Sequence, residues 1–361
     1  MPISSALGSS ALLPAGLGFR NKIINGDMRI AQRGVSTITG SGLPQYPVDR
    51  WAVYNGTGTV TFVQSTDAPA GFTHSILATV TATGSYGTSG YTQITHRIEG
   101  FNCQDLAYGT ASAKTVVLSF WVKSSVVGTQ NVSFKNGGNS RIYAATYTIN
   151  VANTWENKIV TIVGDTGGTW LVDSGTGLEV TFNLGMGTQY DVTGGSWQSA
   201  GSVYSTSGAI DFAANSGATF RVAGVQLEQN NQPTPFEQRP ISVELTLCQR
   251  YYYMHTPYVG NTQRNIAGGI WYSAAQLHVP IKLATTMRAL PTLVMPNGTG
   301  YYVAYNTSGG ANIDSLVMEA TCSTTTQVEI YAGGLSGGVS GAASMFRTNN
   351  INAYVAFNAE L

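Results

Sequence analysis

The feature that most constrains this chain is an alternation of apolar and polar residues with a period of two, which recurs from one end to the other. In the run TVVLSFWVKSS, Val116, Leu118, Phe120 and Val122 share one face. A strand points successive side chains to opposite sides of its sheet, so this pattern is typical of strands with one buried face. The alternation therefore predicts antiparallel strands that are half exposed.

Two further runs predict strands of the same kind. In LEVTFNLGM the apolar face opposes Glu179, Thr181 and Asn183, which we expect to be exposed. The apolar positions of this run are Leu178, Val180, Phe182, Leu184 and Met186. The corresponding positions of the closing run NAYVAFNAEL are Ala353, Val355, Phe357, Ala359 and Leu361.

Short turn signals separate the predicted strands, and one strand changes its register. In ATFRVAGVQLEQ the apolar set switches from Phe220 and Val222 to Val225 and Leu227, which predicts a β-bulge at Gly224. NGTG, GDTGG, DSGTG and NTSGG are turn sequences at short intervals. Frequent turns between short strands favour a β-sandwich over alternating strand and helix units.

The length and one break in the alternation predict at least two domains. A chain of 361 residues exceeds the ~250 residues at which single cores stop growing. Pro240 precedes Ile241, Leu245, Cys248 and Tyr252, whose spacing predicts a short helix with one apolar face. We therefore predict an all-β chain with four parts. These are an N-terminal attachment arm (1–20), a jelly-roll β-sandwich (21–240), a junction helix (241–250) and a smaller, sandwich-like β tip domain (251–361).

Composition excludes several classes of partner. Charged residues make up 10% of the chain, with 18 basic and 18 acidic residues, so no basic stripe predicts nucleic-acid binding. The N-terminal arm is apolar but interrupted by proline and glycine, which predicts neither a signal peptide nor insertion into a membrane. Its large side chains, Leu12, Leu13, Leu17 and Phe19, show no helical or strand pattern, and we expect them to dock on a neighbouring protein.

No motif of catalysis, metal binding or cofactor binding stands out. Three widely spaced cysteines, Cys103, Cys248 and Cys322, predict free buried thiols. The histidines lack metal-ligand spacing, and the one GxSxG match at 334–338 lies in a Gly-rich stretch with no histidine after it. We predict no catalytic residue, no metal and no cofactor, although paired carboxylates that meet only in the fold stay open.

Tyrosines supply the predicted recognition site. Tyrosine offers a flat, rigid face to sugar rings at low entropic cost. Tyr301, Tyr302 and Tyr305 stand beside turn sequences in GTGYYVAYNTSGG, so we predict ligand contact there, together with Asn306. Tyr251, Tyr252, Tyr253 and Tyr258 flank the junction helix, and we expect them to pack between domains or to form a subunit interface.

Several of these segments resemble phage tail fiber and related receptor-binding proteins. They are FRNKIINGDMRIAQRG (19–34), YPVDRWAVY (46–54), LSFWVKSS (118–125), the run from 220 to 253 that contains QLE and FEQRP, MRALPTL (287–293) and AFNAEL (356–361). The resemblance implies a jelly-roll domain like those of carbohydrate-binding modules, a smaller distal β-domain and a homotrimer. It implies no fixed catalytic residues.

The leading hypothesis is therefore a non-catalytic bacteriophage fiber protein that attaches to a host cell-surface polysaccharide. Its expected partners are two further copies of the chain, other virion proteins reached through the arm, and the glycan. Its expected place is the virion, assembled in the cytoplasm of the host bacterium. Two alternatives stay open: a structural head or collar fiber or adaptor without receptor binding, and a polysaccharide depolymerase.

Overall fold

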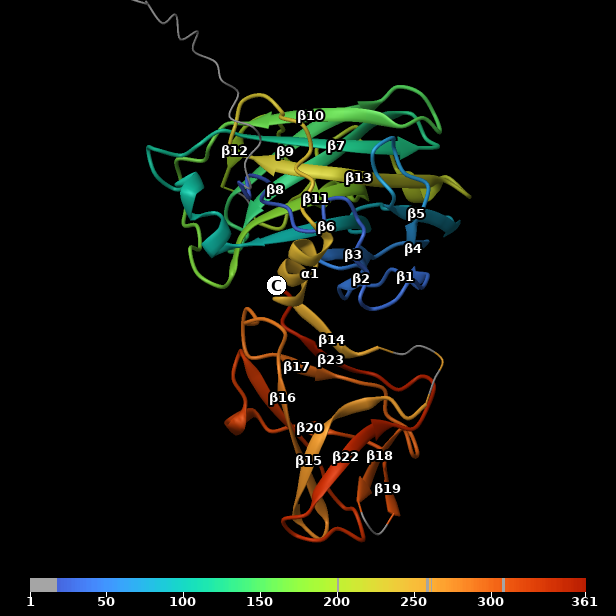
Figure 1. The fold of residues 1–361 in the computed structure, drawn as a ribbon. Coiled ribbons are helices and arrows are strands. Elements are labelled where there is room, and N and C mark those ends of the chain that lie inside the picture. Colours follow the sequence, from blue (N-terminus) through green and yellow to red (C-terminus); the bar gives the residue numbers. More distant parts are fainter. Residues whose placement is uncertain (1–17, 200, 258–259, 261, 307–308) are drawn as a thin grey trace, which may run out of the picture.

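The computed structural model describes residues 18–199, 201–257, 260, 262–306 and 309–361. The predicted arm residues Leu12, Leu13 and Leu17 lie outside this part of the chain, while Phe19 lies within it. Figure 1 shows a larger β-rich unit, coloured blue to yellow, above a smaller one in orange and red, with helix α1 (Ile241–Gln249) at the waist. The predicted all-β fold class is confirmed.

The larger unit consists of facing antiparallel sheets that enclose a shared core. The first sheet has the order β1 (Ile38–Thr39), β4 (Thr59–Ser65), β5 (Ser75–Ala82), β13 (Thr219–Glu228), β7 (Val116–Ser124), β10 (Glu156–Ile162). The second has the order β12 (Trp197–Gln198), β9 (Ile142–Ile149), β8 (Gly128–Asn136), β11 (Thr176–Met186), β6 (Tyr91–Glu99), β3 (Trp51–Asn55), β2 (Gln45–Val48). Short 3-10 turns are η1 (Gly100–Asn102), η2 (Gln104–Leu106), η3 (Thr188–Tyr190) and η4 (Phe212–Ala214).

The core between these sheets is built by the alternating residues. Val116, Leu118, Phe120 and Val122 of β7 are all fully buried, as the sequence predicts. Phe182 of the facing sheet meets Phe120 edge to face, with ring centroids 4.9 Å apart. Such aromatic pairs contribute about 0.5–1.5 kcal/mol beyond the area they bury, so they help to fix how the sheets face each other.

The prediction that the polar face of β11 is exposed is wrong. Glu179, Thr181 and Asn183 are buried although they point away from the core. Tyr204 lies against this face: the Asn183 side-chain amide donates to its carbonyl, and its ring centroid is 3.5 Å from Nζ of Lys135, which lies beside Glu179. A local pattern shows that a face is polar, but only the path of a distant segment decides whether water reaches it.

The bulge predicted at Gly224 is confirmed. The register between β13 and β7 shifts between Ala223 and Gln226, and Gly224 has a φ of 57°. A Cβ atom at this position would lie 2.6 Å from the Phe72 ring. Both the backbone conformation and the close contact therefore require glycine.

The smaller unit contains a short sheet at the waist and a longer one beyond it. The short sheet has the order β14 (Tyr252–Thr256), β23 (Val355–Asn358), β17 (Thr292–Val294). The longer sheet has the order β19 (Gly309–Ile313), β18 (Tyr302–Asn306), β22 (Ala343–Thr348), β15 (Asn265–Ser273), β16 (Gln276–Lys282), β21 (Gln327–Ala332), β20 (Val317–Met318). The turn η5 (Ala320–Cys322) joins its last strands, and Val355 and Phe357 are fully buried in this unit's own core.

Helix α1 forms where the sequence predicts it, and Cys248 and Tyr252 of the predicted apolar face are buried. Ile241 departs from the prediction because it is 52% exposed, and Glu244 is buried in addition. Glu244 accepts hydrogen bonds from the backbone of Asn25 and from Arg239, so a carboxylate takes the place expected for an apolar side chain. The thiol prediction is likewise partly wrong, because Cys103 and Cys248 are buried while Cys322 is exposed.

The tyrosines after α1 join the units within one chain. Tyr251 is fully buried, its hydroxyl donates to Glu99 over 2.7 Å, and the Arg50 guanidinium lies 3.5 Å from its ring centroid. Tyr252 is also buried. Both rings therefore pack between the two units, the first of the two predicted uses, and leave little surface for a subunit interface. Tyr258 lies outside the described residues.

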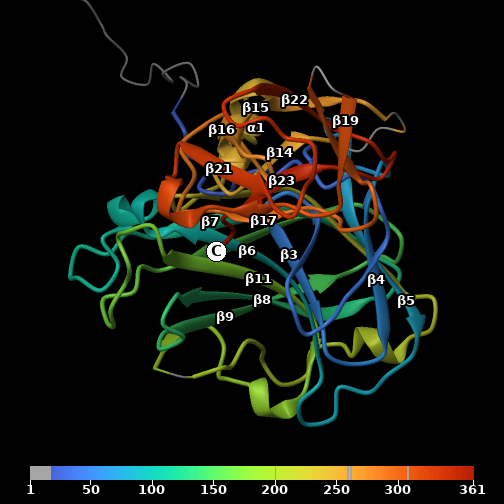
Figure 2. The same ribbon diagram turned by 90° about the horizontal axis from the view of Figure 1, so that it is seen from below.

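The chain's last described residues return to this waist, near the C label in Figure 1. Arg97 of the larger unit donates to the carbonyl of Leu361 over 2.9 Å, and Arg288 donates to that of Glu360 over the same distance. Figure 2, seen from below, shows the smaller unit, in orange and red, over one side of the larger unit, with strands β11, β8 and β9 beyond its edge.

Candidate functional site

One predicted recognition residue belongs to the core. Tyr302 is 0% exposed, and its hydroxyl donates to the carbonyl of Tyr354 over 2.7 Å. Strand β18 turns this side chain inward, between the sheet and the waist. The prediction that Tyr302 contacts a ligand is therefore wrong for this fold, because its ring and hydroxyl are both used internally.

Two neighbouring predicted residues, Tyr301 and Tyr305, are partly accessible. Tyr301 packs its ring against Gly298 and the edge of the core, and Tyr305 lies beneath Arg347, whose guanidinium carbon is 5.6 Å from the ring centroid. Asn306 ends strand β18. Neither of the two pockets described below contains these residues.

A row of rings lies elsewhere on the same sheet, on its outer face. Tyr272 of β15, His278 of β16 and Tyr331 of β21 stand on adjacent strands, and His278 is directly paired with Tyr331. The ring centroids are 5.2 Å apart from Tyr272 to His278 and 5.5 Å apart from His278 to Tyr331. Tyr272 is 71% exposed, so the row offers aromatic faces to solvent.

This row lines a broad depression of about 630 Å³ that we call the ring pocket. Its lining residues are Ile270, Tyr272, Gln276, His278, Glu319, Thr321, Cys322, Glu329 and Tyr331. The rings can stack on an apolar ligand face, and the glutamine, threonine and carboxylates can accept or donate hydrogen bonds. Sugars present both kinds of surface, which makes this pocket a candidate sugar-binding site.

Two carboxylates are held in place on the pocket. The Glu329 carboxylate lies 2.6 Å from Nδ1 of His278. Glu319 accepts a hydrogen bond from the Thr321 hydroxyl over 2.6 Å, and this bond, followed by the Thr321 backbone N–H, lowers the pKa of Glu319. The backbone N–H of Glu319 also donates to the carbonyl of Glu329 over 2.8 Å, which fixes the two residues relative to each other.

Sequence reasoning missed the ring pocket because its members are far apart in the chain. Tyr331 and His278 each occupy a polar position in an alternating strand. This local pattern indicates that both rings lie on an outer face, but it does not indicate which rings lie next to each other. The pairing of β16 with β21 brings them together across 53 residues. Strand pairing of this range is not encoded in any local pattern.

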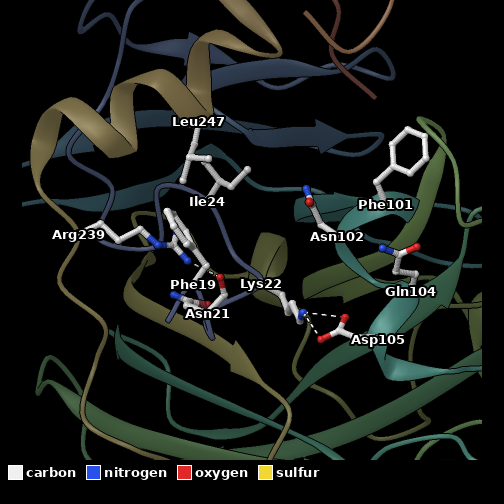
Figure 3. A pocket seen from close by; sticks show the side chains of 10 residues that line it. All are labelled: Phe19, Asn21, Lys22, Ile24, Phe101, Asn102, Gln104, Asp105, Arg239 and Leu247. Carbon is white, nitrogen blue, oxygen red and sulfur yellow. Dashed lines mark hydrogen bonds and ion pairs between the residues drawn. The ribbon is translucent and has the colours of Figure 1, made fainter. Parts of the chain in front are cut away.

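A second pocket, of about 460 Å³, lies on the larger unit beside α1 (Figure 3). Figure 3 shows Phe19 and Phe101 on different sides of it, with the Lys22 ammonium directed at the Asp105 carboxylate. The two distances from Lys22 Nζ to the carboxylate oxygens are 2.8 and 2.6 Å. Phe19, the one predicted arm residue that the structure describes, is 58% exposed here.

The charged groups of this second pocket are engaged by the protein itself. Arg239 donates to the carbonyls of Ile23 and Asn21, and Lys22 is neutralised by Asp105. The side chain of Asn21 bonds the backbone of Val225 and Leu227. The exposed rings of Phe19 and Phe101 are apolar surface beside the exposed amides of Asn102 and Gln104, which suits a protein contact.

Within the described ranges, no three histidine, cysteine or acidic side chains come close enough together to hold a metal ion. No helix in the described part of the chain has the length and apolarity needed to span a membrane. Deep in the larger unit, His96 is fully buried, and burial holds its pKa well below the usual value. It bonds the backbone of Ile24 and serves the core.

Comparison with known proteins gives distant likenesses only. No protein-family model matches the chain, and no curated protein matches it. The enzymatically active domain of tailspike protein 4 from bacteriophage CBA120 is 17% identical with a TM-score of 0.34, over 58% of this chain and 22% of that one. A family 4 carbohydrate-binding module is 13% identical with a TM-score of 0.30, over 57% of this chain and 98% of that one.

A further solved structure is a family 11 carbohydrate-binding module from Clostridium thermocellum in complex with a β-1,3-1,4-mixed-linked tetrasaccharide. It is 13% identical with a TM-score of 0.28, over 55% of this chain and 99% of that one. The functional proposals below rest on this chain's own residues.

Proposed function

We propose that this chain is a non-catalytic fiber component of a bacteriophage virion that attaches to a glycan on the host cell surface. The observation that carries the proposal is the row of Tyr272, His278 and Tyr331 on the outer face of the smaller unit. Stacking on exposed rings, with hydrogen bonds from neighbouring polar groups, is a chemistry suited to sugar rings. The resemblance of six segments to phage fiber proteins supports the biological setting.

The remaining parts of the proposal follow from the same setting. The chain assembles as a homotrimer in the host cytoplasm, and residues 1–20 attach it to another virion protein. Phe19 and Phe101, exposed at the second pocket, supply apolar surface near the start of the described chain for such a contact. Light scattering of the purified chain tests the trimer, and a monomer would contradict it.

The glycan proposal is tested by binding of the purified full chain to a panel of bacterial surface polysaccharides. Changing Tyr331→Ala removes one ring of the row, and we expect the affinity to fall about fivefold or more, since an aromatic contact contributes roughly 1–3 kcal/mol. Isothermal titration with the best polysaccharide of the panel measures this loss.

The matched control is Tyr305→Ala, which removes a tyrosine from the same sheet but outside the ring pocket. We expect this variant to bind like the unchanged chain. If Tyr305→Ala loses binding and Tyr331→Ala keeps it, the site lies at the tyrosines near 301–305. If the unchanged chain binds none of the polysaccharides, a structural fiber or adaptor without receptor binding becomes the better-supported function.

Depolymerase activity is the second candidate, because Glu319 and Glu329 line one pocket and glycosidases use paired carboxylates. Two observations weigh against it. A general acid needs a raised pKa, whereas that of Glu319 is lowered, and Glu329 is bonded to His278. Release of reducing ends from a bound polysaccharide, lost in Glu319→Gln, would establish the enzyme instead.

A further inference from the structure

The ring pocket carries an uneven charge. Its lining includes the carboxylates of Glu319 and Glu329 but neither lysine nor arginine. On the face of β16 that carries His278, the strand provides one cation, Lys282. Lys282 is paired with Gln327 at the end of the strand, whereas His278 is paired with Tyr331. Apart from His278, the charges that a ligand meets in the pocket are therefore negative.

The carboxylates also keep acceptor capacity. In both residues the hydrogen bonds within the described chain go to Oε1: from Thr321 to Glu319 and from His278 to Glu329. The Oε2 atoms accept none from the described residues. Each ionised carboxylate has about four acceptor positions, so both can still receive N–H or O–H donors from a ligand.

We infer that the ring pocket selects a glycan that bears a free amino group and disfavours one that bears uronate or sulfate. This inference rests on the proposed glycan binding and names the class of sugar. An ammonium group on a ring stacked over Tyr331 gains charge-assisted hydrogen bonds to Oε2 of Glu319 or Glu329. An anionic sugar in the same place faces carboxylates without a compensating cation.

The expected size of the effect is modest because both carboxylates are near water. An exposed charge pair changes affinity by up to about fivefold. Two carboxylates therefore give a preference of about twofold to twenty-fivefold at low salt. Screening at about 1 M salt, where the Debye length is ~3 Å, should remove most of it.

The test compares matched ligands on the full chain. A glucosamine oligosaccharide and its fully N-acetylated form have the same backbone and differ in the amine, and an oligogalacturonate supplies the uronate. We expect the amine-bearing form to bind best and the uronate weakest by titration calorimetry at low salt. Glu319→Gln should reduce the ratio between the first two ligands about threefold, whereas Glu156→Gln, on β10 of the larger unit, should keep it.

The outcomes separate the inference from the proposed function. Equal binding of the amine-bearing and acetylated forms, or tighter binding of the uronate, overturns the charge selection and leaves glycan binding standing. If none of the three binds and the polysaccharide panel also fails, the proposed function itself falls. A preference that survives both Glu319→Gln and high salt would place amine recognition outside the ring pocket and contradict the inference.

Discussion

At the scale of single residues, the chain's few charges lie in selected places. Lys135 of β8 is buried, with its Nζ 4.0 Å from a Glu179 oxygen and 3.5 Å from the centroid of the Tyr204 ring. Burial lowers the pKa of Lys135 from its ordinary 10.5 to about 8, and Glu179 opposes part of this shift. A buried ammonium with no hydrogen-bond partner in the described chain destabilises the fold at neutral pH.

This pKa predicts how stability depends on pH. Below pH 8 the lysine is charged in both states, and between about pH 8 and 10.5 the folded protein releases its proton first. The unfolded chain then binds more protons, so the free energy of unfolding rises with pH, by up to about 3 kcal/mol for this group. Lys135→Met should be more stable near pH 7 and should lack that part of the rise.

The measurement is urea unfolding of both proteins at several pH values between 7 and 10.5. The difference between the two curves isolates Lys135 from other groups that titrate in this range. Parallel curves would show that Lys135 keeps an ordinary pKa in the folded state.

At the scale of elements, the bulge in β13 tests how far backbone geometry controls the sheet. Gly224→Ala adds a Cβ atom against the Phe72 ring and forces alanine into a left-handed conformation. We expect a loss of roughly 2–4 kcal/mol in the free energy of unfolding, from backbone strain and overpacking together. Denaturant titration followed by tryptophan fluorescence measures it.

Gly217→Ala is the matched control for this prediction. Gly217 has a φ of 72°, but nothing lies within 4 Å of an added Cβ atom. The free energy of unfolding of this variant should fall by about 1 kcal/mol, which is the cost of the backbone conformation alone. Equal losses of unfolding free energy in the two variants would show that the Phe72 ring moves aside at little cost.

At the scale of the whole molecule, an ion pair joins the two units. Glu360, which follows β23 of the smaller unit, accepts a hydrogen bond from Arg50 of the larger one, and their side chains are 4% and 2% exposed. Arg33 adds a second contact to Glu360 at 3.3 Å. Because these charges are withdrawn from water, each depends on its partner.

Glu360→Ala should therefore destabilise the protein by about 3–5 kcal/mol, since it leaves Arg50 buried without its carboxylate. We also expect the two units to unfold in separate steps, visible by calorimetry. Asp105→Ala breaks the solvent-exposed pair with Lys22 and should cost about 1 kcal/mol or less. If Glu360→Ala lowers the free energy of unfolding by only about 1 kcal/mol, then α1 and Tyr251 alone hold the units together.

The sequence by itself determined the local structure of this protein. The period-two pattern identified strands and their core residues, such as Leu118 and Phe120, and the change of pattern at Gly224 located the bulge. These features depend on the geometry of one strand and on the conformational range of one residue type, so neighbouring residues contain the information.

Tertiary structure alone decided which faces meet water and which residues share a site. The polar face of β11 is buried, with Tyr204 against Asn183, and Tyr302 turns into the core while Tyr331 joins His278 from another strand. Alternation tells that a strand has two faces, but the neighbours that cover each face come from distant parts of the chain. Pairing over such separations depends on the packing of the whole unit, which no local pattern records.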